Sequence, residues 1–518
     1  MDPLEIARWQ FGITTVYHFV MVPLTLGLGA LVVVCHLMWL RTGNEHWLRM
    51  TKFWGKLYLI NFIMGVATGI VQEFQFGMAW SEYSRFVGDV FGAPLAMEAL
   101  LAFFVESTFL GVWIFGWNRL PKGVHFAALA IAVVGSWISA VFIIVANSWM
   151  QHPVGVELVD GRPVMTDIWA VLTNSTAMVA LPHVLTGAVA VGAGFLVGIS
   201  WYQLWRRRRD GIDTVGPDRR VVVGEAPEIP GRDRADHRVW LVSLRVGAVV
   251  AIAGFLGTAV TGDLQAKLMF EQQPMKMAAA EGACAPTADL SLLTIGDLNA
   301  HDCERVTTFL VVPGMLSFLA NGTFDTEVAG IDDLVPIYQE RYGTELPDDP
   351  ILGARAGQQI DYVPNMAVTY WGFRLMIGFG ALAATFAALA LWLTRRGTVP
   401  RSRLLMGVAV ASILGSYGAN IAGWVFTEMG RQPFVVAPNP TGVDGVWQLT
   451  AAAVSPAVDG AEIVFSIVAL GLVYLALMVV EVWLMVRTIR GGVAATMPGR
   501  FDPPEPDRDR SDVLDFAY

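Results

Sequence analysis

The sequence predicts an all-α integral membrane protein with nine transmembrane helices, an N-terminus outside, a cytoplasmic C-terminus and one long outer loop. Only 15% of the 518 residues are charged and 54% are apolar, whereas soluble domains carry roughly 25% charged residues. Nine apolar windows are each long enough to cross the hydrocarbon core as a helix, which takes about 20 residues. The Lys and Arg residues between these windows are unequally shared by the two sides, which is typical of multi-pass membrane proteins.

The nine windows define the order of the helices. They lie near residues 11–40, 52–79, 93–117, 124–149, 178–205, 239–262, 366–394, 403–429 and 461–486. Because their number is odd, the two termini lie on opposite sides of the membrane. Alternate connecting segments carry 24 Lys and Arg residues on one side and 9 on the other. The more basic side is cytoplasmic in membrane proteins, so the N-terminus is expected outside.

These helices divide the chain into four parts. They are transmembrane helices 1–6 in residues 1–262, an extracytoplasmic loop in 263–365, transmembrane helices 7–9 in 366–486 and a disordered cytoplasmic tail in 487–518. The first ten residues contain Asp2, Glu5 and a single basic residue, Arg8. They lack the basic segment of a cleavable signal, so we expect the first helix to stay in the protein.

Net charge and cysteine count argue against several functions. The net charge is −10 and no basic stretch is interleaved with aromatic residues, which argues against a nucleic-acid partner. The chain has three cysteines and no CxxC motif. This argues against a disulfide-rich scaffold, a thiolate zinc site and covalently attached haem.

Two of the three cysteines lie in the outer loop. This loop is acidic, with 16 Asp and Glu residues against 5 Lys and Arg. The outer side of a membrane permits disulfides, so we expect Cys284 and Cys303 to bond to each other, with free thiols as the alternative. Cys35 lies in the first helix and is interpreted as a small core residue.

Polar residues within the predicted helices gather in the outer half of the membrane, where ionisable groups are costly and are therefore functional candidates. At a rise of about 1.5 Å per residue, six of them fall in one layer. These are His18, Glu98, His183, Arg374, Met376 and Glu428. Haem iron accepts His and Met as axial ligands, so the layer indicates a haem protein. Each residue alone could be a packing residue, and His36 and His125, near the inner end, are interpreted as structural.

Histidine spacing separates this prediction from other membrane haem proteins. Di-haem cytochrome b subunits need paired histidines on two helices, and haem-copper oxidases need an adjacent histidine pair at copper. The chain has eight His and no two are adjacent, so neither class fits. A proton-coupled secondary transporter is the alternative from another class, because buried carboxylates serve proton coupling. Inverted repeats with broken helices would be expected there, and we find none.

Five strings resemble subunit I of the cytochrome bd quinol oxidases. They are Gly423 to Pro433 with its Gly-Arg-Gln-Pro ending, Trp371 to Met376, Leu181 to His183, Glu98 with Glu106 to Phe109, and Gln273 to Glu281. With the nine helices, they make the resemblance extend over essentially the whole chain. Phe434 departs from it, since many relatives have Trp there, and the outer loop matches the short-loop type.

The resemblance implies two b-type haems, one low-spin and one high-spin, and one haem d, without copper. It implies that His183 and Met376 ligate the low-spin b haem, and that His18 and Glu428 ligate the two high-spin haems in an order that stays open. Further residues are expected beside the cofactors: Glu98 at haem d, Trp424 between haems, Arg374 near a haem edge, and Arg431 in the signature string.

The resemblance also implies a quinol site and an oxygen-reducing function. Lys276 and Glu281 match the quinol pair, with Glu281 as proton acceptor and Lys276 as donor to the quinone oxygen; a surface couple on an ordinary helix is the alternative. Protons for reducing O2 to water are expected from the cytoplasm through Glu106, Ser107, Ser139 and Asn147 to Glu98, although Ser139 and Asn147 could equally be packing residues.

Several properties of the whole enzyme follow from this interpretation. Outward release and inward uptake of protons would generate a membrane potential without a pump. The expected partners are a second membrane subunit, subunit II of the oxidase, small accessory subunits, quinol, O2 and the lipid bilayer. The expected location is the bacterial cell membrane, with multiple crossings.

Overall fold

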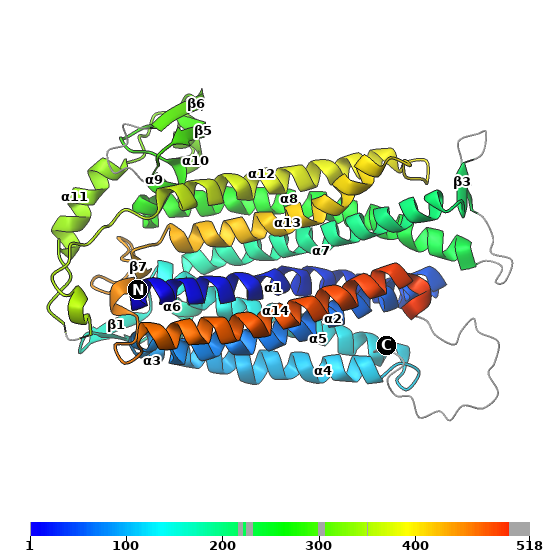
Figure 1. Cartoon of the computed structure of the whole chain (residues 1–518), viewed down its shortest axis with the longest axis horizontal. Helices are drawn as coiled ribbons and strands as arrows, with labels where there is room; N and C mark the ends of the chain where they lie inside the picture. The colour runs from blue at the N-terminus through cyan, green and yellow to red at the C-terminus, as the bar shows by residue number, and fades with distance from the viewer. Residues whose placement is uncertain (1, 216–220, 224–231, 299–305, 350, 497–518) are drawn as a thin grey trace.

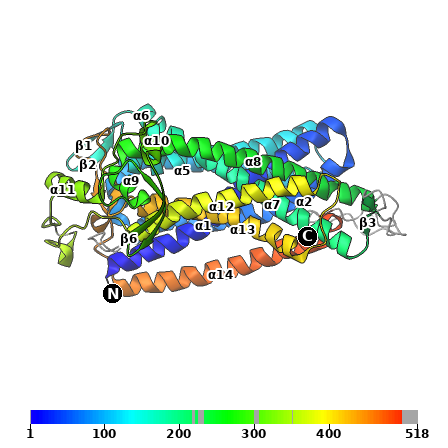
Figure 2. The same cartoon turned by 90° about the horizontal axis from the view of Figure 1, so that it is seen from above.

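The computed structural model describes residues 2–215, 221–223, 232–298, 306–349 and 351–496. Within these residues, nine helices are long and apolar enough to cross a membrane, which confirms the predicted number. They run along the length of one elongated bundle (Figure 1), and a view turned by 90° shows the same arrangement (Figure 2).

Each crossing is built from one helix or from consecutive helical segments. In chain order these are α1 Pro3–Thr42; α2 Glu45–Gly77; α3 Ser81–Met97 with the π-helical η1 Glu98–Phe103 and α4 Phe104–Phe115; α5 Lys122–Gln151; α6 Ile168–Leu172 with α7 Ser175–Arg209; α8 Arg232–Gln272; α12 Met366–Leu393; α13 Arg403–Met429; and α14 Gly460–Gly491. Local capping residues set several starts. Asp2 accepts the Leu4 N–H at 3.0 Å, and Asn174 accepts the Thr176 N–H at 2.8 Å.

The helices are longer than the apolar windows because polar turns continue them past the hydrophobic stretch. The third crossing starts at Ser81, not near residue 93, and α8 runs to Gln272, so the outer loop begins ten residues later than predicted. At the C-terminus, α14 and the short η4 (Val493–Thr496) continue through residues predicted as a disordered tail. Residues 497–518 of that tail lie outside the described residues.

The two ends of the bundle differ. The loop end carries the N-terminus and the segment between α8 and α12 (Figure 1). The arginine end, defined by Arg206 to Arg209, Arg395 to Arg396 and Arg401 to Arg403, carries the last turns of α7 and α14 and the hairpin of β3 (Asp213–Val215) and β4 (Val221–Val223). The separation of basic residues agrees with the charge asymmetry of the sequence.

Short elements cover the loop end. Those of the loop itself are α9 Pro274–Glu281, β5 Leu290–Gly296, β6 Val306–Val312, α10 Met315–Asn321, α11 Ile331–Tyr342 and η2 Gly353–Arg355. Those between other helices are β1 Val156–Val159, β2 Arg162–Met165, β7 Phe434–Val436, β8 Gln448–Leu449 and η3 Thr450–Ala452. The hairpin β5–β6 is antiparallel and pairs Leu290 with Val312 and Gly296 with Val306.

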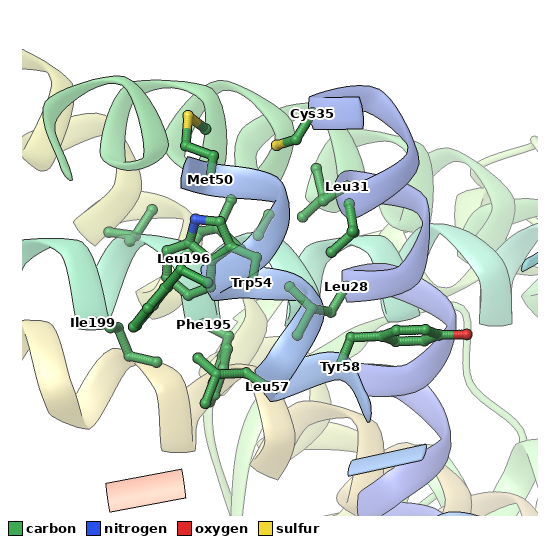
Figure 3. Packing of buried hydrophobic residues seen from close by; sticks show 14 of the residues in the cluster. Leu28, Leu31, Cys35, Met50, Trp54, Leu57, Tyr58, Phe195, Leu196 and Ile199 are labelled. Atoms are coloured by element: carbon green, nitrogen blue, oxygen red, sulfur yellow. The ribbon is translucent and has the colours of Figure 1, made fainter. Parts of the chain in front are cut away.

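The largest apolar core lies in the half of the bundle toward the arginine end, where α1, α2 and α7 meet (Figure 3). Cys35 is 2% exposed within it, which confirms its predicted role. The helices α1 and α7 approach closely where Gly27 of α1 meets Gly192 of α7. A Cβ on Gly27 would lie 2.0 Å from the Ala188 carbonyl oxygen. Only glycine fits such a crossing.

His36 and His125 lie beside this core. The His36 ring is fully buried and stacks on Trp39 with ring centroids 5.4 Å apart. The His125 Nε2 atom is 2.8 Å from the Trp113 carbonyl oxygen. Both histidines therefore pack within an aromatic cluster, which agrees with their interpretation as structural residues.

Candidate functional site

Four helices bring the predicted ligand residues into the loop half of the bundle. His18 lies on α1, His183 on α7, Met376 on α12 and Glu428 on α13, and all four side chains are half-buried. Each is positioned by a neighbouring helix, since α1 packs on α2, α7 on α8 and α12 on α13.

The two histidines have the same hydrogen-bond arrangement. The His18 Nδ1 atom is 2.9 Å from the Thr68 hydroxyl on α2. The His183 Nδ1 atom is 3.2 Å from the Thr261 hydroxyl on α8. In both rings Nδ1 is engaged, which leaves Nε2 as the nitrogen that can bind a metal.

Met376 contacts α13 from α12, next to Trp424, which is itself a residue of α13. The Met376 sulfur lies so close to Gly423 that a Cβ there would be only 2.7 Å from it. The Trp424 ring stacks on Phe19, the residue after His18, with centroids 5.1 Å apart. Trp424 thus lies between the helix that carries Glu428 and the helix that carries His18.

Glu428 is held by two side chains at the loop end of the bundle. Its Oε2 atom accepts a hydrogen bond from Arg431, one turn along the chain, and its Oε1 atom accepts one from the Asn147 amide on α5 at 2.8 Å. The Nε and Nη1 atoms of Arg431 are buried and have no hydrogen-bond partner among the described residues. The Arg431 guanidinium therefore has two donors that could bind a carboxylate of a bound molecule.

Lys276 is connected to Glu428 through two amides. Its ammonium donates to the Gln151 Oε1 atom at 3.0 Å, and the Gln151 amide donates to Asn147 at 2.8 Å. Asn147 in turn contacts Glu428, so one hydrogen-bonded chain joins α9, in the segment between α8 and α12, to the predicted ligand residue on α13. Burial and the nearby Arg431 guanidinium lower the pKa of Lys276 to about 7, although Glu428 opposes the shift.

Glu281 does not pair with Lys276. It forms an ion pair with Arg374 on α12, with 2.6 Å between the Glu281 Oε2 and Arg374 Nη2 atoms. The same guanidinium donates to the Ser291 carbonyl oxygen at 3.0 Å, while its Nε atom is buried and has no partner among the described residues. Arg374, predicted beside a haem edge, therefore also anchors the loop to the bundle.

The two carboxylates of the third crossing each contact a serine on α5. Ser139 donates to Glu98 at 2.5 Å, and Ser136 donates to Glu106 at 2.5 Å. Glu98 opens the π-helical segment η1, so the two glutamates are not related by α-helical geometry alone as the sequence analysis assumed. Single π-helical turns recur at functional sites. The serines are three residues apart on one face of α5, so the two Ser–Glu pairs follow one another along the bundle. We call Glu98, Ser139, Glu106 and Ser136 the ladder.

Two predicted members of this route lie elsewhere. The Ser107 side chain is exposed and donates to the Phe103 carbonyl oxygen at 2.8 Å, so it does not join the ladder. Asn147 contacts Glu428 instead. Sequence analysis missed Ser136 and Gln151, which lie one helical turn from Ser139 and Asn147 respectively; this spacing was the available signal.

Several buried polar atoms fit a bound haem. The Nε2 atoms of the two histidines, the Met376 sulfur and the Glu428 carboxylate are donor types that ligate haem iron or suit its surroundings. The Gln75 amide, 1% exposed, and the Trp80 indole N–H have no partner among the described residues. Buried polar groups are normally hydrogen-bonded, so these atoms provide capacity for a polar group such as a carboxylate.

The predicted disulfide is only partly covered by the structure. Cys284 follows α9 and lies in the described part of the loop. Cys303 lies outside the described residues. The Cys284–Cys303 pairing stays a prediction.

Comparisons with known proteins identify the family of the chain. The family model described as "Cytochrome bd terminal oxidase subunit I" matches residues 6–493. The chain is 39% identical to a Bacillus subtilis protein named "Cytochrome bd ubiquinol oxidase subunit 1", over 95% of this chain and 94% of the relative. It is 32% identical to the Escherichia coli "Cytochrome bd-II ubiquinol oxidase subunit 1", over 95% of this chain and 98% of the relative.

The fold matches as well. A solved structure of bd oxidase from Geobacillus thermodenitrificans superposes with a TM-score of 0.76 at 24% identity, covering 94% of this chain and 98% of that one. The family model covers nearly the whole chain, and both relatives match it over most of their length. The chain therefore belongs to the family of cytochrome bd terminal oxidase subunit I.

Proposed function

We propose that this chain binds three haems in its loop half, oxidises quinol beside α9 and reduces O2 to water at a copper-free haem d. Its family makes it a subunit of a terminal quinol oxidase of the bacterial membrane, with haem cofactors. The observation that carries the finer proposal is the hydrogen-bonded chain from Lys276 through Gln151 and Asn147 to Glu428. It connects the loop to the membrane layer of ligand residues.

The proposed cofactors are two b haems, one low-spin and one high-spin, and one haem d. His183 and Met376 would hold the low-spin b haem, and His18 and Glu428 the two high-spin haems. Bound haem would supply one-electron transfer and, where a coordination position is free, a place for O2. The protein residues fix the ligands: Thr68 and Thr261 orient the histidines, and Arg431 with Asn147 orients Glu428.

The quinol would bind between the loop and the bundle. Lys276 is positioned to donate to a quinol oxygen, and its pKa of about 7 lets it exchange a proton near neutral pH. Glu281 is positioned to accept a proton, and its ion pair with Arg374 is the contact that has to rearrange as it does so. The released protons leave at the loop end.

The ladder of carboxylates would supply protons from the opposite side. Glu106 lies farther from the loop end than Glu98, and each carboxylate has a serine that can pass a proton to or from it. Two quinols and one O2 give two quinones and two waters, with four protons released at the loop end and four taken up through the ladder. Turnover then moves charge across the membrane without a pump.

Proteoliposomes with the purified complex test this topology. We expect oxygen consumption from added quinol to build a membrane potential, and Glu106→Gln to slow both together. Glu481→Gln is the matched control, because Glu481 is also a buried glutamate within a crossing but lies on α14, away from the ladder. Oxygen consumption without a membrane potential in the unmodified complex would contradict the proposal.

The chain functions with subunit II in its family, and small accessory subunits are a further expectation. Nothing in the comparisons favours the proton-coupled transporter. A transporter would also leave the Thr-oriented histidines and the Met376 contact without a role. A reduced-minus-oxidised spectrum distinguishes the two, because a transporter carries no b or d haem signals.

A further inference from the structure

The two candidate haem-ligating histidines face the same dipeptide on different helices. His18 on α1 meets Thr68 and Gly69 of α2. His183 on α7 meets Thr261 and Gly262 of α8. These helix pairs occupy separate parts of the chain, so the repeated Thr-Gly arrangement is two independent observations of one geometry.

Each threonine hydroxyl donates its proton to a carbonyl oxygen of its own helix. The Thr68 hydroxyl lies 3.0 Å from the carbonyl oxygens of Met64 and Gly65 and donates to this pair. The Thr261 hydroxyl donates to the Gly257 carbonyl oxygen at 2.8 Å. A hydroxyl has a single proton. Its oxygen can therefore only accept from the imidazole, which requires that the histidine carries its own proton on Nδ1.

The glycines leave room for the imidazole rings. A Cβ on Gly69 would lie 3.1 Å from the Cε1 atom of His18, and one on Gly262 would lie 3.2 Å from the Cε1 atom of His183. Both distances are shorter than ordinary carbon contacts, which lie at about 3.5–4.0 Å. With glycine, each ring can approach the neighbouring helix closely enough for its Nδ1 atom to reach the threonine.

We propose that Thr68-Gly69 and Thr261-Gly262 are positioning pairs that fix each histidine in the Nδ1–H tautomer and leave its Nε2 atom available to ligate haem iron. The inference rests on the proposed ligand roles of His18 and His183. A hydrogen bond from Nδ1–H to an oxygen makes Nε2 a better electron donor. The threonines therefore strengthen the bond to oxidised iron and lower the reduction potential of the haem concerned.

The two sites differ in their dependence on the threonine. The His18 Nδ1 atom lies 2.9 Å from the Thr68 hydroxyl, whereas the His183 Nδ1 atom lies 3.2 Å from the Thr261 hydroxyl. The shorter hydrogen bond is the stronger one. We expect loss of the hydroxyl to have the larger effect at Thr68.

Redox titration of the purified complex, followed by haem absorption, tests the proposal. Thr68→Val and Thr261→Val keep the side-chain shape and remove the hydroxyl. Each is expected to raise the midpoint potential of one haem and leave the others unchanged: a high-spin haem for Thr68 and the low-spin b haem for Thr261. Thr68→Ser and Thr261→Ser are expected to restore the potential. Unchanged potentials in both Val variants would overturn the proposal.

Control variants separate orientation from folding. Thr51→Val on α2 and Thr385→Val on α12 remove hydroxyls that donate to a carbonyl oxygen of their own helix, Trp47 and Ala381 respectively, and no potential should change. If a Val variant loses its haem, retention in the Ser variant supports the proposal, and equal loss in both overturns it. His18→Ala and His183→Ala test the ligand roles themselves: full haem content and unchanged spectra there would refute the proposed function instead.

Discussion

Buried charged residues at the two ends of the bundle have different partners, although both ends also contain buried polar atoms without a partner among the described residues, such as the Arg208 Nε and Trp201 indole nitrogens toward the arginine end. At the arginine end, Asp213 accepts from Arg207 at 3.0 Å and is 2.8 Å from the His237 Nδ1 atom, while His237 Nε2 is 3.1 Å from the Gly397 carbonyl oxygen. In the loop half, two nitrogens of Arg431 and both polar atoms of the Gln75 amide have no partner among the described residues.

The comparison concerns charged groups that lie beside predicted ligands and those that do not. A buried donor without a partner costs about 1–3 kcal/mol, and the unpartnered nitrogens of Arg431 belong to the guanidinium that donates to Glu428. The Arg207–Asp213–His237 cluster joins three chain segments at the arginine end, where Asp213 contacts both Arg207 and His237. The loop half keeps capacity that a cofactor or substrate can use.

The largest expected effect comes from a ligand in the loop half. Met376→Leu should abolish the low-spin b haem spectrum, because leucine has no sulfur to coordinate iron. Met485→Leu is the matched control, since Met485 is equally a methionine within a crossing but packs in the core toward the arginine end. The measurement is the reduced-minus-oxidised spectrum of each purified complex. An unchanged spectrum for Met376→Leu would contradict the assignment.

The next effect concerns Lys276. Lys276→Ala should lower quinol oxidation about a hundredfold, the lower range for loss of a proton-transfer group. Since the pKa of Lys276 is lowered to about 7, the lysine loses its charge as the pH rises through 7. Unmodified enzyme should therefore show an inflection there in its activity profile, and Lys276→Arg, whose guanidinium stays charged, should lack it.

A half-buried lysine, Lys267, controls for nonspecific charge effects. Lys267→Ala removes the ion pair with Asp263, in which both side chains are 35% exposed, and should leave the profile unchanged. An inflection near pH 7 that persists in Lys276→Arg would assign it to another group.

A smaller effect is expected at the link between the two sites. Gln151→Leu leaves Lys276 and Asn147 without their mutual partner, and should lower turnover per haem about tenfold, or ~1.4 kcal/mol. Gln203→Leu is its counterpart at the arginine end, where Gln203 is 1% exposed and bonds the Ile489 carbonyl oxygen. It should lower stability and leave turnover per haem intact. If Gln151→Leu and Gln203→Leu lowered turnover per haem equally, the proposed functional role of Gln151 would be contradicted.

The smallest effect on activity is expected at Asp213. Burial raises the pKa of its carboxyl, but the hydrogen bonds from His237 and Arg207 outweigh burial and hold the pKa below its ordinary value. This stabilisation is present above the ordinary pKa of about 3.9 and is lost as the pH falls through the lowered value.

Asp213→Asn tests that structural role. It should reduce the stability of the complex at neutral pH by about 3 kcal/mol, because it removes the buried carboxylate that Arg207 and His237 contact. Turnover per haem should not change. Thermal unfolding of the complex between pH 7 and pH 3 is the measurement: the variant should lose less stability on acidification than the unmodified protein. Lost turnover at unchanged stability would place Asp213 in the functional machinery.

Much of the fold could be predicted from the sequence because the bilayer imposes simple rules. The length of the apolar windows correctly predicted the number of membrane-spanning helices among the described residues. The Arg-rich connections in the sequence lie together at the arginine end of the bundle. Helix ends were less accurate. The start at Ser81 and the end at Gln272 were missed because the terminal turns lie outside the apolar stretch, where hydropathy carries no signal.

Candidate site residues could be proposed by type but not by pairing. His18, His183 and Glu428 were proposed from their depth in the helices, yet their neighbours Thr68 and Thr261, and Ser136 beside Glu106, were missed because threonine and serine are common in membrane helices. Their role depends on which helices are neighbours. The pairing of Glu281 with Arg374, and not with Lys276, likewise follows from the docking of α9 on α12, which one sequence does not encode locally.

A cryo-EM map of the purified complex with its haems tests the central claim most directly. The account predicts one haem iron bonded to the His183 Nε2 and Met376 sulfur atoms, and two further irons at His18 and Glu428, all in the loop half. It further predicts that the His18 Nδ1 atom stays within hydrogen-bond distance of Thr68. Iron density near the arginine end, or irons bound to other side chains, would contradict it.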